Sequence, residues 1–143
     1  RYSHNVIIEV LSNDNGKQVE FYRNPYNPAG NSYYKENSDY FTEVSKTLRT
    51  TRTMDSIVEE RGMRLPDLVK IDVQGAELDV LQGMKKTLQN CEDIIVEAQH
   101  EEYNEGAPRF DEVRAYLESI GFELKNVINT EKVDADYHFK RYK

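Results

Sequence analysis

One segment constrains the fold of this chain more than any other, namely residues 67–83, which read DLVKIDVQGAELDVLQG. Its first half is typical of a buried strand, and its second half spaces apolar residues as an amphipathic helix does. Gly75 lies between the two and supplies the backbone freedom for a sharp turn. Open α/β sheets bind ligands at the carboxyl ends of their strands, where Asp72 falls. The segment therefore predicts a strand, turn and helix at the edge of a functional site.

Length and charge exclude several classes of protein. The chain has 143 residues, which fits a single domain over residues 1–143. Asp and Glu number 26 against 19 Lys and Arg, for a net charge of −7, which disfavours a nucleic-acid partner. No apolar run is long enough for a signal peptide or a membrane span, and the single Cys91 has no partner for an internal disulfide. These features indicate a soluble protein of a reducing compartment, the cytoplasm.

The first half of the chain is expected to contain three strands and one helix. Residues 5–11 and 17–22 predict a β-hairpin, because a cluster of turn formers separates them. Residues 24–45 show no sustained period and predict a long, ordered loop, a kind of segment that is often functional. Residues 48–53 predict a short strand. Thr53 or Asp55 then caps a brief helix.

The second half alternates strands and helices. A helix is expected at about residues 76–89, a strand at 94–98, and a further helix from Pro108 to Gly121. Residues 122–128 and 137–142 predict a final pair of strands, antiparallel because their connection is short. This order predicts an α/β fold with a mostly parallel sheet, crossover helices and an antiparallel finish.

Several short motifs in this order resemble the FkbM family of methyltransferases. They are TMDSI at residues 53–57, PDLVKIDVQGAE at 66–77, the pair Leu81 and Gly83, and IVE at 95–97. The resemblance covers roughly residues 5–100. It implies a class I, Rossmann-like enzyme that moves a methyl group from S-adenosylmethionine, usually to an oxygen. In that layout the central strand is the fourth strand, and the last two strands form the closing hairpin of the class.

The chain departs from the family at the cofactor site. The family's glycine-rich first turn and the acidic strand end that holds the ribose both precede the region that matches. None of the seven glycines forms a pair two residues apart after an apolar strand. The chain is therefore expected to be the carboxyl-terminal portion of the fold, without its first strands and without the cofactor-binding front half.

Four side chains are expected to converge at the ligand edge. Alternation along the strands places Lys70 and Asp72 on one face, and Glu97 and Gln99 on one face of the next strand. Methyl transfer to a hydroxyl requires positioning and removal of a proton, for which Asp72 or Glu97 is a candidate base. Asp72 and the nearby Gln74 are the candidate contacts to the cofactor.

Each of these assignments has an alternative. Asp72 and Glu97 together suit Mg²⁺, which prefers oxygen ligands. Asp72 is equally suited to cap the turn and pair with Lys70 as a structural ion pair. His100 is a second candidate base, or a solvated surface residue. Glu77 is favourable in the first turn of a helix without any function, and we expect a structural role for it.

Other candidate groups are given mainly structural interpretations. His4 and His138 lie far apart and have no spacing typical of a zinc site, so no metal ligand is assigned. The tyrosines between Tyr26 and Tyr40 suit stacking on a sugar ring, but packing of the loop is the favoured interpretation.

The sequence leaves two functions in competition. The first is a methyltransferase that O-methylates a small molecule or a glycan. The second is a non-catalytic binding or assembly module that kept the sheet and lost the cofactor site. A sheet without its first strands exposes an edge, and exposed edges recruit other chains, so homo-oligomers are expected.

Overall fold

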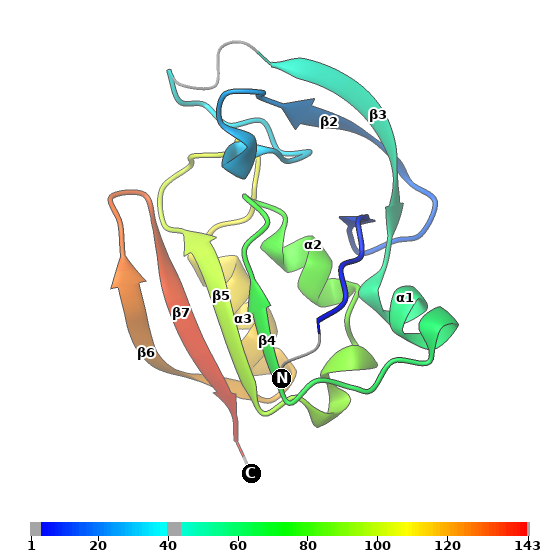
Figure 1. Cartoon of the computed structure of the whole chain (residues 1–143). Helices are drawn as coiled ribbons and strands as arrows, with labels where there is room; N and C mark the ends of the chain where they lie inside the picture. The colour runs from blue at the N-terminus through cyan, green and yellow to red at the C-terminus, as the bar shows by residue number, and fades with distance from the viewer. Residues whose placement is uncertain (1–3, 40–43, 143) are drawn as a thin grey trace.

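The computed structural model describes residues 4–39 and 44–142, which form two β-sheets and a few short helices (Figure 1). The strands are β1 (Val10–Leu11), β2 (Gln18–Arg23), β3 (Ser45–Arg52), β4 (Leu68–Ile71), β5 (Asp93–Gln99), β6 (Phe122–Thr130) and β7 (Asp134–Arg141). The helices are α1 (Met54–Arg61), α2 (Glu77–Gln82) and α3 (Phe110–Ser119), with 3-10 helices η1 (Pro28–Gly30) and η2 (Thr87–Asn90). The predicted α/β class is confirmed.

The larger sheet has the order β4-β5-β7-β6. β4 and β5 are parallel and joined through α2, whereas β5–β7 and β6–β7 are antiparallel. The crossover and the antiparallel finish were both predicted. The sheet is nevertheless mixed rather than mostly parallel, because the β6–β7 hairpin turns back and its second strand pairs with β5.

The smaller sheet has the order β1-β3-β2, and it corrects the hairpin predicted for residues 5–11 and 17–22. β1 is only two residues long and pairs in parallel with β3, while β2 pairs with β3 in the antiparallel sense. β3 is longer than the strand predicted at residues 48–53, and it pairs with β1 along one edge and with β2 along the other. The turn-forming residues 12–16 therefore lead the chain past β3. As a result, β1 and β2 lie on opposite sides of β3 instead of pairing with each other.

The core lies between one face of the larger sheet and two helices. Ile94 and Val96 of β5 and Phe139 of β7 are fully buried against Leu81 of α2 and Leu117 of α3. Figure 1 shows α3 lying against this face. Burial of a side chain such as Leu117 contributes roughly 1.5–3 kcal/mol. This packing fixes β4 and β5, whose carboxyl ends carry the candidate site.

The helix expected at residues 76–89 is divided in two. α2 ends at Gln82, and η2 begins only at Thr87. Asp55 causes the break, since its carboxylate accepts hydrogen bonds from the backbone N–H groups of Lys86 and Thr87 at 2.9 and 2.7 Å. The helix that contains Asp55 was predicted with its cap: Thr53 caps α1, and the left-handed Gly62 ends it.

β4 is an edge strand among the residues that the structure describes. It pairs with β5 on one side, and along the other runs a largely apolar cavity of about 550 Å³. Leu68 of β4 lines this cavity and is 55% exposed. Within the described ranges, none of the helices is both long enough and apolar enough to cross a membrane.

Candidate functional site

The turn after β4 is held by the first residue of the helix that follows. The carboxylate of Glu77 accepts hydrogen bonds from the backbone N–H groups of Val73 and Gly75, both at 3.1 Å. Burial raises the pKa of Glu77 to about 6. Within the turn, Gln74 and Gly75 have positive φ values of 52° and 97°. Glu77 therefore has the structural role expected of it, as a brace of the turn.

This turn brings together the carboxylates of Asp72 and Glu97. The side-chain amide of Gln74 donates to Asp72 Oδ1 and to Glu97 Oε2, both at 3.0 Å. The expected convergence is found for Lys70, Asp72 and Glu97, because β4 and β5 are parallel neighbours, but not for Gln99. The catalytic and cofactor-binding roles of Asp72, Gln74 and Glu97 stay predictions.

The electrostatics of the group centre on Glu97. Burial and the neighbouring Asp72 raise the pKa of Glu97 to about 7, and Asp134 and Asp136 act in the same direction. Lys70 supplies a positive charge, with its Nζ 3.8 Å from Asp72 Oδ2 and 3.6 Å from Asp136 Oδ1. The structural ion pair between Lys70 and Asp72 thus coexists with the contact between Asp72 and Gln74.

Asp134 and Asp136 also belong to this site, although the sequence pattern predicts the last strand only from residue 137. β7 begins at Asp134, and its register places Asp136 opposite Glu97 and Asp134 opposite Gln99. The available signal was the alternation of Asp134, Asp136 and His138, which continues the strand pattern backwards. Their position next to β5 depends on an antiparallel register that sequence does not encode locally.

The other two predicted residues at this edge point to different partners. Gln99 is buried, and its Oε1 accepts from the backbone N–H groups of Tyr103 and Asn104 at 3.1 and 3.0 Å. It organises the loop after β5 rather than contacting Asp72. The ring Nε2 of His100 lies 3.0 Å from the carbonyl oxygen of Lys132, on the exposed surface. The role of His100 as a base stays a prediction.

The long loop of residues 24–39 forms a wall beside this edge. Asn104 donates to the carbonyl of Tyr34 at 3.0 Å, and the hydroxyls of Tyr33 and Tyr34 both donate to Asp79 Oδ2 at 3.0 Å. These contacts order the loop and confirm the packing interpretation for Tyr33 and Tyr34, whereas Tyr26 is 82% exposed. Tyr40 lies outside the described residues.

A second cavity, of about 210 Å³, lies between the smaller sheet and the turn. Its polar and aromatic lining consists of Glu9, Phe21, Asn31, Ser32, Tyr33, Asp72 and Gln74. Asp72 also lines the 550 Å³ cavity along β4. One carboxylate therefore borders two spaces, which suits a reaction between two bound molecules.

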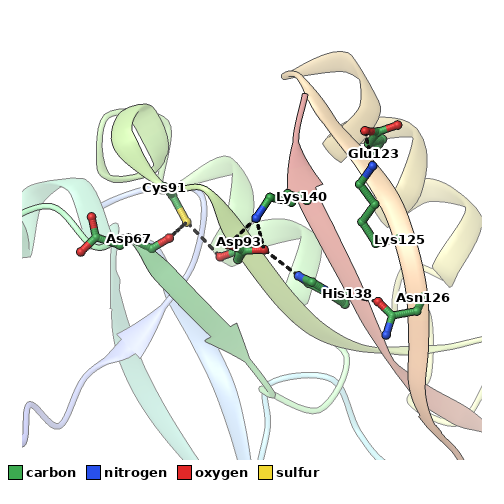
Figure 2. Close-up of polar contacts among 8 residues, drawn as sticks. All are labelled: Asp67, Cys91, Asp93, Glu123, Lys125, Asn126, His138 and Lys140. Atoms are coloured by element: carbon green, nitrogen blue, oxygen red, sulfur yellow. Dashed lines mark hydrogen bonds and ion pairs between the residues drawn. The ribbon is translucent and has the colours of Figure 1, made fainter. Parts of the chain in front are cut away.

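No group of three or more His, Cys, Asp or Glu side chains in the described part of the chain is arranged to hold a metal ion. His138 has other partners: its Nε2 lies 2.7 Å from Asp93 Oδ1 and its Nδ1 lies 2.9 Å from Asn126 Oδ1. Figure 2 shows this ring between β5 and β6, with Lys140 on the same carboxylate. The contacts connect three strands of the larger sheet.

Comparison with known proteins identifies the family. Residues 3–124 match the methyltransferase FkbM domain, so the chain belongs to the FkbM methyltransferase family. The resemblance inferred from the motifs is confirmed. Membership implies S-adenosylmethionine as the methyl donor of the family. No solved structure matches the chain significantly.

Three curated proteins are similar to parts of the chain. A hexuronic acid methyltransferase, AglP of Haloferax volcanii, is 45% identical over 56 residues, which is 39% of this chain and 23% of AglP. The 2-O-methyltransferase NoeI of Sinorhizobium fredii is 43% identical over 56 residues, with the same shares of 39% and 23%. The AMB antimetabolite synthetase AmbE of Pseudomonas aeruginosa is 36% identical over 74 residues, 51% of this chain and 4% of AmbE. The chain therefore matches less than a quarter of the length of each.

Proposed function

We propose that this chain is part of an S-adenosylmethionine-dependent methyltransferase that methylates a hydroxyl oxygen of a small molecule or glycan in the cytoplasm. One observation carries the proposal: Asp72, Gln74 and Glu97 are hydrogen-bonded together at the carboxyl ends of two parallel strands, in a member of a methyltransferase family. Open α/β sheets bind ligands at this edge.

Glu97 is the proposed general base. A base is most effective when its pKa lies near the working pH, and the pKa of Glu97 is raised to about 7. S-adenosylmethionine, when bound, would supply the methyl group to the acceptor oxygen and would leave as S-adenosylhomocysteine. The hydroxyl proton passes to the carboxylate of Glu97. Asp72 acts on this carboxylate directly, by raising its pKa, and also through the amide of Gln74, which donates to both carboxylates.

Asp72 and Gln74 are the proposed contacts to the cofactor, which supplies the methyl group when bound. The Asp72 side chain is 42% exposed and borders both cavities, so its carboxylate is free to accept hydrogen bonds from ligand hydroxyls. We infer that the remaining cofactor contacts lie outside this chain, since its glycines lack the spacing of the glycine-rich turn that holds the cofactor in such folds.

The names of the relatives support a glycan acceptor. AglP is named for a hexuronic acid, and NoeI for transfer to a 2-oxygen. The first name gives a sugar acid as the methylated compound, and the second gives an oxygen as the methylated atom. Mg²⁺ would bind through Asp72 and Glu97 if it takes part.

Calorimetric titration of the chain with S-adenosylhomocysteine, with and without Mg²⁺, tests the cofactor site. We expect micromolar binding that Asp72→Asn weakens about tenfold, because a hydrogen bond to a charged group contributes roughly 1.5–3 kcal/mol. Asp93→Asn, on the same sheet face but away from the turn, is the control and is expected to bind normally. Binding unaffected by Asp72→Asn would contradict the assignment of Asp72.

Methyl-transfer assays distinguish the role of the general base from that of the residues that contact the cofactor. Glu97→Gln is expected to keep S-adenosylhomocysteine binding and to lose about 10²–10⁴-fold in transfer rate, the usual contribution of a general base. His100→Gln is the matched variant for the second candidate base. A rate loss in His100→Gln and none in Glu97→Gln would transfer the role of base to His100.

The free edge of β4 supports a second candidate function, an assembly module. An unpaired strand edge exposes backbone N–H and C=O groups that pair readily with another strand. The cavity beside β4 is lined by apolar side chains such as Leu68 and Met63, which suits protein rather than solvent. In this alternative the edge pairs with a second copy of the chain, and S-adenosylhomocysteine does not bind.

A further inference from the structure

The 210 Å³ cavity is built from three separated parts of the chain. Phe21 comes from β2, Asn31 and Tyr33 from the long loop, and Asp72 and Gln74 from the turn after β4. Figure 1 shows η1, at the start of this loop segment, beyond the carboxyl end of β4. The cavity therefore borders Asp72 and Gln74, and Glu97 lies behind Gln74, whose amide donates to it at 3.0 Å.

Its aromatic wall is fixed in position. Tyr33 donates its hydroxyl hydrogen bond to Asp79 Oδ2 at 3.0 Å and lies 3.3 Å from Ser12 Oγ. Burial raises the pKa of the Tyr33 hydroxyl, which keeps it protonated as the donor. The ring of Tyr34 packs against that of Tyr33, with centroids 5.1 Å apart. A held ring offers an apolar surface at little entropic cost, as a flat ligand ring requires.

The charged groups that line the cavity disfavour an anionic ligand. Glu9 and Asp72 are both in its lining, and no Lys, Arg or His is among the described residues that line it. The cations nearby are already paired: Arg52 Nη1 lies 3.6 Å from Glu9 and Arg52 also pairs with Glu60, while Lys70 Nζ lies 3.8 Å from Asp72 and 3.6 Å from Asp136. A carboxylate or phosphate in this space would face two carboxylates without a free cation.

The hydrogen-bonding groups of the cavity call for a ligand that donates. Ionised carboxylates only accept hydrogen bonds. The amide N–H₂ of Gln74 is occupied by Asp72 and Glu97, which leaves its carbonyl oxygen as an acceptor. Three acceptors around one small space match a compound that carries several hydroxyl groups.

From these observations we propose that the 210 Å³ cavity is the acceptor subsite, and that it takes an uncharged, hydroxyl-bearing ring and rejects its carboxylate-bearing counterpart. The inference rests on the proposed methyl transfer to a hydroxyl and narrows its substrate to neutral sugars, which differ from the hexuronic acid that the name of AglP gives. Phe21 and Tyr33 contact the ring, and Glu9 acts as the residue that selects against negative charge.

Binding of matched sugars tests the inference without any cofactor. The probes are methyl glucoside with methyl glucuronide and methyl galactoside with methyl galacturonide, because the members of each pair differ only in the carboxylate. Binding to the chain is followed by NMR chemical-shift titration. We expect the neutral member to bind at least about threefold more tightly, the effect of one unit charge at about 6 Å in water. The difference is expected to shrink in high salt.

A charge variant makes the test specific to this cavity. Glu9→Gln is expected to tighten uronate binding by about threefold and to leave the neutral member unchanged. Glu20→Gln, an exposed residue of β2 outside the cavity that pairs with Lys46, is the control and is expected to change neither. The two variants remove the same charge from neighbouring parts of the chain.

Three results would overturn the inference: equal or tighter binding of the uronates, a preference that Glu9→Gln leaves unchanged, or no binding of either member of any pair. A parallel titration with S-adenosylhomocysteine reports on the proposed function by itself. Cofactor binding combined with a uronate preference would reject only the acceptor class. Loss of cofactor binding with the neutral preference intact would reject only the methyltransferase proposal.

Discussion

Gln74 illustrates how single residues define the site. Its backbone is left-handed, with φ of 52°, a conformation that is uncommon for residues other than glycine and costs about 1 kcal/mol or more. That conformation aims the side-chain amide at both Asp72 and Glu97. The strain is therefore used to hold two carboxylates side by side, which otherwise repel each other.

Glu97 should make the stability of the protein depend on pH. Its pKa is raised from 4.5 to about 7, so the folded state binds more protons than the unfolded state between these values. The free energy of unfolding should therefore fall as the pH rises from about 4.5 to 7. Glu97→Gln should remove this dependence and stabilise the protein at pH 8 by about 1 kcal/mol, after allowance for solvent screening. Urea unfolding at pH 5 and pH 8 measures both effects.

The result for Glu97 has a clear contrary outcome. If the variant and the original chain lose the same stability between pH 5 and pH 8, the pKa of Glu97 is not raised in the folded protein. A pKa measured by NMR near the ordinary value of 4.5 would lead to the same conclusion.

Gly75 tests the close packing of the turn. Its φ is 97°, and an added Cβ would lie 2.8 Å from Ala107 Cβ and 3.0 Å from Asn104 Cβ. Gly75→Ala should therefore combine backbone strain with overpacking and destabilise the protein by about 2–4 kcal/mol. Gly106→Ala is the matched control, because Gly106 has φ of 70° but open space around it. Urea denaturation should show a loss of only about 1 kcal/mol for the control.

At the scale of the elements, Asp55 connects helices that are far apart in sequence. Its carboxylate accepts from Thr87 N and Thr87 Oγ1 at 2.7 Å and from Lys86 N at 2.9 Å. These bonds start η2 and pack it against α1. The same carboxylate lies in the first turn of α1, where the helix dipole favours a negative charge.

Asp55→Ala should destabilise the fold by about 2–3 kcal/mol, because it removes charge-assisted hydrogen bonds and leaves backbone donors without a partner. Glu59→Ala is the comparison on the same helix. Glu59 makes only an exposed ion pair with Lys86 at 3.4 Å, worth about 0.2–1 kcal/mol. Thermal unfolding followed by circular dichroism distinguishes the two, and similar losses would mean that Asp55 does not link the helices.

At the scale of the whole molecule, the free edge of β4 makes self-association testable. We expect dimers at micromolar concentration, in which the β4 edges of two copies pair and the partner covers the apolar groove, the 550 Å³ cavity along β4. Leu68→Lys places a charge in that groove and should shift sedimentation to the monomer. Ile128→Lys on β6 is the control, since Ile128 is 54% exposed and Leu68 is 55% exposed. A monomer in both the original chain and the control would exclude the edge as an interface.

The sequence predicted most elements because their signals are local. Thr53 and Gly62 bound α1 as capping rules require, and residues 122–128 and 137–142 mark the final antiparallel pair. The hairpin of residues 5–11 and 17–22 failed because strand pairing depends on partners that are distant in sequence. The divided helix failed because Asp55, some thirty residues away, breaks it.

By itself, the sequence determined the family, the α/β class, the turn at Gly75 and the candidate carboxylates Asp72 and Glu97. Strand periodicity and motif order contain this information. Only the tertiary structure decided that Gln74 joins those carboxylates, that Asp134 and Asp136 lie beside them, and that Asp72 borders two cavities. These features arise from strand register and from contacts between distant segments, which are fixed by packing of the whole chain rather than by any local pattern.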